Sequence, residues 1–214
     1  MNIINSHKEI FSNGFDIEND KILITSTSFT EDEDFNLLIK SLIEFEKYLQ
    51  DSKFNNNNNN NNKIYMIITG KGPKRDYYMN LIKNEKFEKI IIKNVWLKIE
   101  DYPKILKISD LGISLHYSSS GLDLPMKIVD LFGCGIPVIS MNFPSISELV
   151  KDNINGLILK DNNNEIELFE KIKLLIIDNY DGKKLYNNLK KNCIIESEKN
   201  WDDEWMSKLS KRLI

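Results

Sequence analysis

Short apolar runs alternate along this chain with segments whose apolar residues recur at helical spacing. Each apolar run is short enough to form a buried strand of a parallel sheet. The predicted strands are residues 21–26, 64–69, 89–93, 111–115 and 138–139. The predicted helices between them are residues 30–49, 74–85 and 127–134, and residues 101–109 are expected to cross to the fourth strand. This alternation is typical of right-handed βαβ units, so the sequence predicts an α/β fold with a doubly wound, mostly parallel sheet.

The pattern becomes purely helical after residue 159. Residues 161–214 are therefore predicted to form a C-terminal helical segment that packs on or across a domain of residues 21–160. The last predicted helix carries Trp201, Trp205 and Leu209 at a spacing of four residues. This apolar stripe either stays exposed or folds onto the sheet of the same domain.

Two polar segments are explained by local chemistry. Thr30 followed by Glu33 predicts a capping box at the start of a helix. The acidic residues 31–34 suit the first turn of that helix on electrostatic grounds, so they do not require a metal site. Residues 55–62 are all asparagine, which leaves no apolar side chain to bury, and we expect a disordered surface loop there.

Composition narrows the possible partners. A hydrophobic content of 41% is sufficient for a globular core, and a net charge of −3 gives no large basic field, so nucleic acid is not an expected partner. Cys134 and Cys193 provide neither a disulfide framework nor the spacing of metal ligands, and they fit a reducing compartment. No apolar run approaches the roughly 20 residues that span a bilayer, so we expect the chain by itself to be soluble.

Several candidate ligand-binding residues follow the end of the fourth predicted strand. Ligands of open α/β sheets collect at the carboxyl ends of the strands, and Ser119, Ser120 and Gly121 follow this strand end directly. Asp123 precedes the next helix and Asp130 lies inside it. Small hydroxyl residues and backbone N–H groups near a helix N-terminus suit a diphosphate, and a carboxylate two turns further on suits the hydroxyls of a ribose. The sequence therefore predicts a pocket for a nucleoside diphosphate.

Each candidate in this segment has an alternative explanation. Asp130 either binds a ribose, or it caps a neighbouring turn or faces solvent. Asp123 either binds the ligand or serves as the helix N-cap ahead of Pro125, and both roles are compatible. Lys127 lies in the first helical turn, where the helix dipole disfavours a cation, so it indicates a nearby phosphate unless it is simply solvated.

Four further candidate residues precede this segment in the chain. Gly70 and Lys71 begin a Gly-Lys-Gly-Pro turn, in which glycines let the backbone approach a phosphate, although the same turn commonly ends a strand. His116 has either a direct role or a purely structural one at the end of its strand. Trp96 either lines the pocket near a base or belongs to the core, and its size favours the core.

Four segments resemble the chitobiosyldiphosphodolichol β-mannosyltransferase family of GT-B glycosyltransferases. They are residues 25–42 (TSTSFTEDEDFNLLIKSL), 68–78 (ITGKGPKRDYY), 100–138 (which include SSSGLDLPMKIVDLFGCGIPV) and 148–159 (ELVKDNINGLIL). The resemblance covers residues 22–159 and implies a Rossmann-like, nucleotide-sugar-binding donor domain. It gives Asp130 the place of the ribose-binding carboxylate, and Glu148 resembles an acid near the base or sugar, or else belongs to a surface helix. Where many GT-B donor domains carry Arg and Lys after the first strand, this chain has hydroxyls such as Ser28.

The resemblance also implies an activity and a location. The family transfers mannose from GDP-mannose to dolichyl-diphosphate-chitobiose on the cytosolic face of the endoplasmic reticulum, in N-glycosylation, and GT-B relatives usually use no metal or other cofactor. A GT-B enzyme has two Rossmann-like domains, whereas 214 residues suit one. We therefore expect the donor-binding half, with residues 1–20 as a linker remnant. The catalytic base and the acceptor site would lie on the absent domain, and the chain alone would be inactive.

A different class of function remains open from the sequence. The chain would then be a non-catalytic paralogue or a fragment that binds a nucleotide sugar, or a protein partner at the uncovered face of the domain.

Overall fold

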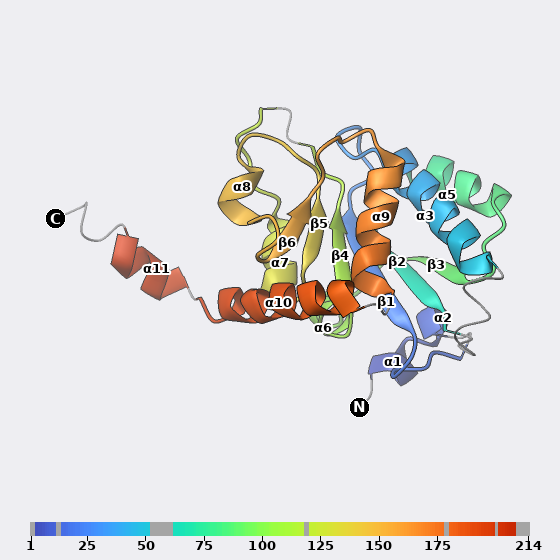
Figure 1. Cartoon of the computed structure of the whole chain (residues 1–214), viewed down its shortest axis with the longest axis horizontal. Helices are drawn as coiled ribbons and strands as arrows, with labels where there is room; N and C mark the ends of the chain where they lie inside the picture. The colour runs from blue at the N-terminus through green and yellow to red at the C-terminus, as the bar shows by residue number, and fades with distance from the viewer. Residues whose placement is uncertain are drawn as a thin grey trace.

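The sheet has the predicted architecture. The computed structural model describes residues 3–11, 14–51, 62–117, 120–177, 180–199 and 201–208. Six strands pair in parallel in the order β3-β2-β1-β4-β5-β6 (Figure 1). The α/β fold with a doubly wound parallel sheet is thereby confirmed. The strand order reverses between β1 and β4, which is where open α/β sheets bind their ligands.

Five of the six strands match predicted runs to within about two residues. The strands are β1 (Lys21–Thr27), β2 (Ile64–Gly70), β3 (Ile90–Val95), β4 (Leu111–Ser114), β5 (Val138–Ser140) and β6 (Gly156–Ile158). Thr27 pairs with Gly70, so β1 and β2 end level with each other. The strand β6 was not predicted from the sequence. Of the predicted asparagine loop, only Asn62 lies within the described residues.

Helices cover both faces of the sheet (Figure 1). In chain order they are α1 (Ile3–Ser6), α2 (Lys8–Phe11), α3 (Phe35–Gln50), α5 (Arg75–Asn84), α6 (Tyr102–Lys107), α7 (Met126–Gly133), α8 (Ile146–Leu149), α9 (Glu165–Ile176), α10 (Tyr180–Ser197) and α11 (Trp201–Lys208). The helix α3 packs against α9 on one face, and α6 packs against α7 on the other. The helix α10 crosses near the amino ends of the strands, where the hydroxyl of Tyr186 donates to the carbonyl of Asp110 at 2.9 Å.

The start of α3 differs from the prediction. The N-cap is Asp34, whose carboxylate accepts the N–H of Asn36, and the helix begins at Phe35. Glu33 turns inward and is only 2% exposed. The predicted capping box of Thr30 and Glu33 is therefore wrong, and the acidic residues 31–34 precede the first helical turn instead of filling it. The cause is a set of distant partners for Glu33, described below.

Val129 is an apolar residue of α7 that is not buried. Ile128, Leu131 and Phe132 are buried, whereas Val129 is 43% exposed. In a helix, Val129 is rotated by about 100° from Ile128.

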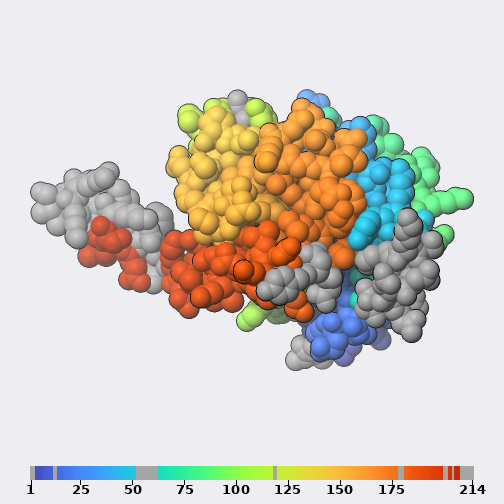
Figure 2. Space-filling model, viewed as in Figure 1, coloured from blue at the N-terminus to red at the C-terminus, as the bar shows by residue number. Residues whose placement is uncertain are grey.

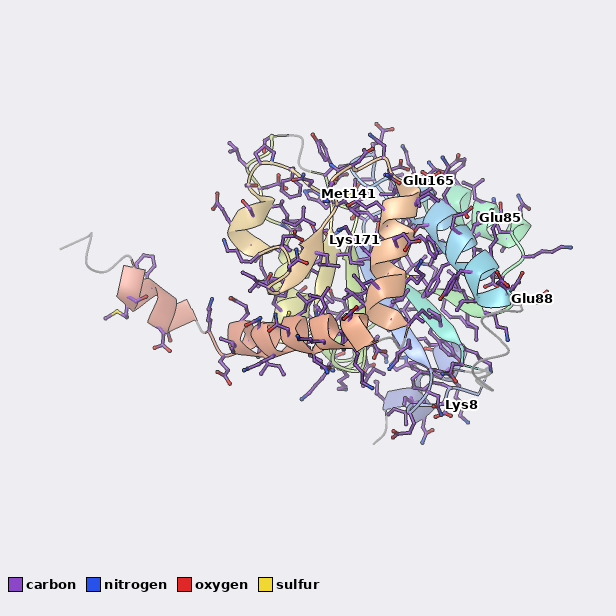
Figure 3. All side chains as sticks on the ribbon, in the orientation of Figure 1. Lys8, Glu85, Glu88, Met141, Glu165 and Lys171 are labelled. Carbon is purple, nitrogen blue, oxygen red and sulfur yellow. The ribbon has the colours of Figure 1, made fainter. Side chains whose placement is uncertain are left out.

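A buried carboxylate fixes the start of β3. Glu46 of α3 is 4% exposed, and it accepts the backbone N–H groups of Glu88, Lys89 and Ile90, each at 2.9 Å. Figure 3 places Glu88 beside the C-terminal end of α3. A buried charge is tolerated when it is hydrogen-bonded in this way, so Glu46 joins α3 to the edge strand.

The two ends of the chain pack differently. Near the N-terminus, Ile10 and Phe11 are buried, and the Phe11 ring lies 6.0 Å from that of Tyr65 in β2. This packing was not expected of a linker remnant. At the other end, Figures 1 and 2 show α11 beyond the end of α10 and away from the sheet, and Trp205 is 39% exposed. In this structure α11 does not fold onto the sheet; Leu209 lies outside the described residues.

No helix within the described ranges has both the length and the apolar character needed to cross a bilayer.

Candidate functional site

A cavity of about 560 Å³ lies at the carboxyl ends of β1 and β2. We call it the switch-point cavity, because it adjoins the reversal of strand order between β1 and β4. Its lining is formed by residues 26–28, 69–70, 96–99, Tyr102 and Lys127. Ser28, Gly70 and Lys127 are predicted site residues, and the fold brings them together from three separate elements. A volume of this size is typical of a site for a small organic ligand.

The turn after β2 packs directly onto the loop after β1. Gly70 has a φ of +150°, and a Cβ atom there would lie 1.8 Å from the carbonyl oxygen of Thr27. A Cβ atom on Gly72 would lie 1.6 Å from the carbonyl oxygen of Ser28. No side chain fits at either position. The glycines of the predicted strand-exit turn therefore allow two backbone segments to form one wall of the switch-point cavity.

Trp96 is not part of the core, so the preferred interpretation of this residue is wrong. Its side chain is 64% exposed, and it lines the switch-point cavity. It follows Val95, the last residue of the edge strand β3, where no neighbouring strand covers it. The ammonium of Lys71, a predicted site residue, lies 4.5 Å from the centre of the Trp96 ring, which is within the range of a cation–π interaction.

Lys127 is held by a buried carboxylate. Its side chain is 19% exposed, and its ammonium pairs with Glu33 Oε1. The other oxygen of Glu33 accepts the hydroxyl of Thr27 at 2.5 Å and the N–H of Ser28 at 3.1 Å. The alternative of a solvated Lys127 is therefore wrong. Lys127 of α7 thus brings a positive charge to the lining of the switch-point cavity, whereas the segment after β1 carries only hydroxyls.

Asp130 contacts Tyr102, which lines the switch-point cavity. The hydroxyl of Tyr102 lies 3.3 Å from Asp130 Oδ2, and the Ser26 hydroxyl lies 2.9 Å from the same tyrosine oxygen. Burial, with a smaller contribution from Asp130, raises the pKa of Tyr102 to about 12, so this tyrosine remains a neutral donor at physiological pH. Asp130 itself is exposed, which leaves its carboxylate accessible to a ligand hydroxyl.

A second cluster lies beside the switch-point cavity and joins two loops. His116 Nδ1 lies 3.1 Å from Asp32 Oδ2, and His116 Nε2 lies 2.6 Å from Asp123 Oδ2. The N-cap position of α7 is occupied by Pro125, which makes no side-chain cap. The alternative that Asp123 caps this helix is therefore wrong. The hydroxyl of Thr30, and more weakly His116, hold the pKa of Asp32 below its usual value.

The remaining predicted residues are spread along the loops of the same sheet edge. The Ser120 hydroxyl accepts the N–H of Leu122 at 3.2 Å. Gly121 has a φ of +71°, and its carbonyl accepts the N–H of Ser145 at 3.1 Å. Glu148 is exposed on the short helix α8, which agrees with the alternative that it belongs to a surface helix. Ser119 lies outside the described residues.

Sequence reasoning assigned no site role to Glu33, Asp32 or Tyr102. One signal for Glu33 was available, since a lysine in the first turn of a helix needs a compensating anion. The sequence did not indicate which of the nearby acids would supply it.

The two cysteines are both free. The thiol of Cys193 is fully buried and donates to the carbonyl of Asn155 at 3.1 Å, and burial raises its pKa to about 12. Cys134 is partly exposed, and burial raises its pKa as well. In the described part of the chain, no group of three or more His, Cys, Asp or Glu residues is placed to hold a metal ion.

These environments predict the reactivity of the thiols. Because the thiolate is the reactive form, Cys193 should not react with a disulfide reagent at pH 7.5 in the native protein, and Cys134 should react slowly. Both should react rapidly in guanidinium chloride. Absorbance of the released chromophore measures this directly, and rapid native labelling of Cys193, located by peptide mass, would contradict the buried environment.

Comparison with known proteins identifies the family. The family model described as "Glycosyl transferases group 1" matches residues 6–194. The chain belongs to the group 1 glycosyltransferases. One curated relative is the "Chitobiosyldiphosphodolichol beta-mannosyltransferase" of Debaryomyces hansenii, which is 44% identical over 212 residues. The aligned part covers 98% of this chain and 43% of that protein. The protein of the same name from Homo sapiens is 42% identical over 189 residues, or 88% and 39%.

These relatives confirm the resemblance to that mannosyltransferase family. This group 1 chain spans about two fifths of the length of the curated relatives it matches. Among solved structures, HepE of Anabaena in complex with UDP-glucose has a TM-score of 0.68 at 17% identity, with 99% of this chain and 52% of that chain covered. The C-terminal domain of a Francisella tularensis group 1 protein has a TM-score of 0.59 at 14% identity, with 94% and 91% covered. At these identities the two structures show the fold alone, and the fold is that of GT-B glycosyltransferases.

Proposed function

We propose that this chain is the GDP-mannose-binding part of a β-1,4-mannosyltransferase that acts on dolichyl-diphosphate-chitobiose in N-glycosylation. The observation that carries the proposal is the switch-point cavity, where hydroxyls, a glycine turn and an ammonium group from three elements meet. The names of the relatives at 42–44% identity support the choice of acceptor and sugar. From what the resemblance to this family implies, we also propose that the reaction takes place on the cytosolic face of the endoplasmic reticulum.

The chemistry of the lining suits each part of a nucleotide sugar. Lys127, Lys98 and the neighbouring Lys71 bring positive charge to the switch-point cavity, which attracts a diphosphate. The exposed ring of Trp96 offers a surface on which a guanine can stack. Asp130, beside Tyr102, has the free carboxylate oxygen that the paired hydroxyls of a ribose need.

These residues would assist the reaction by stabilising the departing GDP. Negative charge develops on the diphosphate as the bond to mannose breaks, and lysine ammonium groups placed beforehand lower the energy of that state. We propose that this requires no metal ion. The resemblance implies inversion at the anomeric carbon, with the base and the acceptor site supplied by a second domain, so that this chain alone binds the donor without turnover.

A second function is favoured by one surface feature. Leu122, in the loop between β4 and α7, is 80% exposed, and Met126, the first residue of α7, is 70% exposed. Apolar side chains exposed together commonly mark a protein interface. A non-catalytic binder of a nucleotide sugar or of a protein partner would show this feature too, and it would remain inactive when the acceptor domain is supplied.

Calorimetric titration tests the donor site. GDP and GDP-mannose should bind saturably and more tightly than UDP-glucose. Replacing Asp130 with alanine should weaken GDP binding by roughly 10- to 150-fold, because a hydrogen bond to a charged group contributes about 1.5–3 kcal/mol. The stability of this variant should change little, since Asp130 is exposed.

Asp181→Ala is the matched control, because Asp181 is exposed on the distant helix α10. Its affinity for GDP should equal that of the unmodified chain. A folded protein that binds neither guanosine ligand would contradict the proposal, and an unchanged affinity of Asp130→Ala would contradict the assignment of the ribose site.

A further inference from the structure

Glu33 occupies an unusual position for an acidic side chain. It is 2% exposed, and burial of a carboxylate is costly unless the charge is paired and its oxygens are hydrogen-bonded. Both conditions are met, because one oxygen accepts from Thr27 and Ser28 while the other pairs with Lys127. The pair joins residues that are 94 positions apart in the sequence.

The partners of Glu33 lie on opposite sides of the strand-order reversal. Thr27 ends β1 and Ser28 follows it, whereas Lys127 lies in the first turn of α7, which follows β4. All three also line the switch-point cavity. Glu33 is therefore the group through which the β1 side and the α7 side of the cavity are held in register.

Stability alone is a weak explanation for this arrangement. Well-packed apolar residues in place of a buried ion pair often stabilise a fold equally well or better. The first turn of a helix is also an unfavourable place for a cation. A lysine ammonium has three N–H donors, and Glu33 engages one of them, so the same group can still donate to a ligand in the cavity that it lines.

We propose that Glu33 is a positioning residue that holds the Lys127 ammonium at the end of β1, where it contacts the diphosphate of the donor. The proposal rests on the proposed function. A lysine side chain normally samples many rotamers, and holding it in place beforehand removes part of the entropy cost of binding. Glu33 does not contact the ligand in this arrangement. It acts through Lys127, whose ammonium it holds.

The test compares ligands with and without phosphate. Affinities for GDP and guanosine are measured by calorimetry and ligand-observed NMR for the unmodified chain, Glu33→Gln, Lys127→Met and the double variant. Each single variant should bind GDP about tenfold more weakly and guanosine with unchanged affinity. The double variant should bind GDP no more weakly than Lys127→Met, because Glu33 acts through Lys127.

Glu33→Asp covers the case in which Glu33→Gln does not fold. It keeps the negative charge but is shorter by one methylene, so the ammonium is misplaced, and GDP affinity should fall while guanosine affinity does not. A Glu33 variant that weakens both ligands equally would overturn the inference and indicate a merely structural role. An unmodified chain that binds neither ligand would overturn the proposed function and this inference together.

Discussion

Replacement of Gly72 by alanine is expected to abolish measurable GDP binding and to destabilise the fold. The added Cβ atom would lie 1.6 Å from the carbonyl oxygen of Ser28 and 3.1 Å from Cβ of Phe29. That loop has little room to retreat, because Phe29 is fully buried and its ring lies 5.0 Å from that of Phe35. The turn of residues 70–73 must move instead, and it carries Gly70 and Lys71 away from the switch-point cavity. Overpacking of this kind typically costs about 1–3 kcal/mol.

Gly133→Ala provides the matched control. Gly133 lies in α7, and a Cβ atom there would meet no other atom within 4 Å. Because alanine favours a helix by up to about 1 kcal/mol over glycine, this variant should be as stable as the unmodified chain or slightly more so. Unfolding in guanidinium chloride measures stability, and calorimetry measures GDP affinity. A Gly72→Ala protein with unchanged stability and affinity would show that the two backbone segments are not in close contact.

The sheet could be predicted because buried parallel strands leave a local signature. Runs such as residues 64–69 are apolar throughout, since helices cover both faces of the sheet. Helical spacing then places the connecting helices, so the order of elements follows from neighbouring residues alone. The three-residue strand β6 lacks such a signature, and it pairs through its backbone with β5. Its existence depends on where the preceding chain has already been placed.

The site was predicted in part, because several of its contacts join distant residues. Asp130, Lys127 and Gly70 could be named from local chemistry at strand ends and helix starts. The partner of Lys127 could not, because Glu33 also satisfies the local rule for a capping box. In the fold, a pairing across 94 residues takes precedence over that rule. The pairing of His116 with Asp32 could not be predicted for the same reason, because 84 positions separate the two residues in the sequence.

Trp96 shows the same limit for an aromatic residue. A tryptophan after an apolar run is expected in the core, because its large apolar surface favours burial. Whether it can be buried depends on the strand order, since β3 is an edge strand. The exposed ring beside the switch-point cavity is therefore a candidate contact for the ligand.

Trp96→Ala should weaken GDP binding by roughly 5- to 150-fold while leaving stability almost unchanged. Stacking of a base on an aromatic side chain contributes about 1–3 kcal/mol when measured by alanine substitution. The side chain is 64% exposed, so its removal opens no large space in the core. Truncation also removes the ring over which the Lys71 ammonium lies at 4.5 Å, which frees that ammonium to move.

Two further variants separate stacking from a general loss of surface. Trp96→Phe keeps an aromatic ring and should recover most of the affinity for GDP. Tyr77→Ala removes an aromatic ring that is 57% exposed on α5, and its affinity should match that of the unmodified chain. If Trp96→Ala and Tyr77→Ala bind GDP equally well, Trp96 does not stack on the base. If Trp96→Ala also loses several degrees of thermal stability, the ring supports the fold more than its exposure indicates, and the loss of affinity would then follow from a displaced loop.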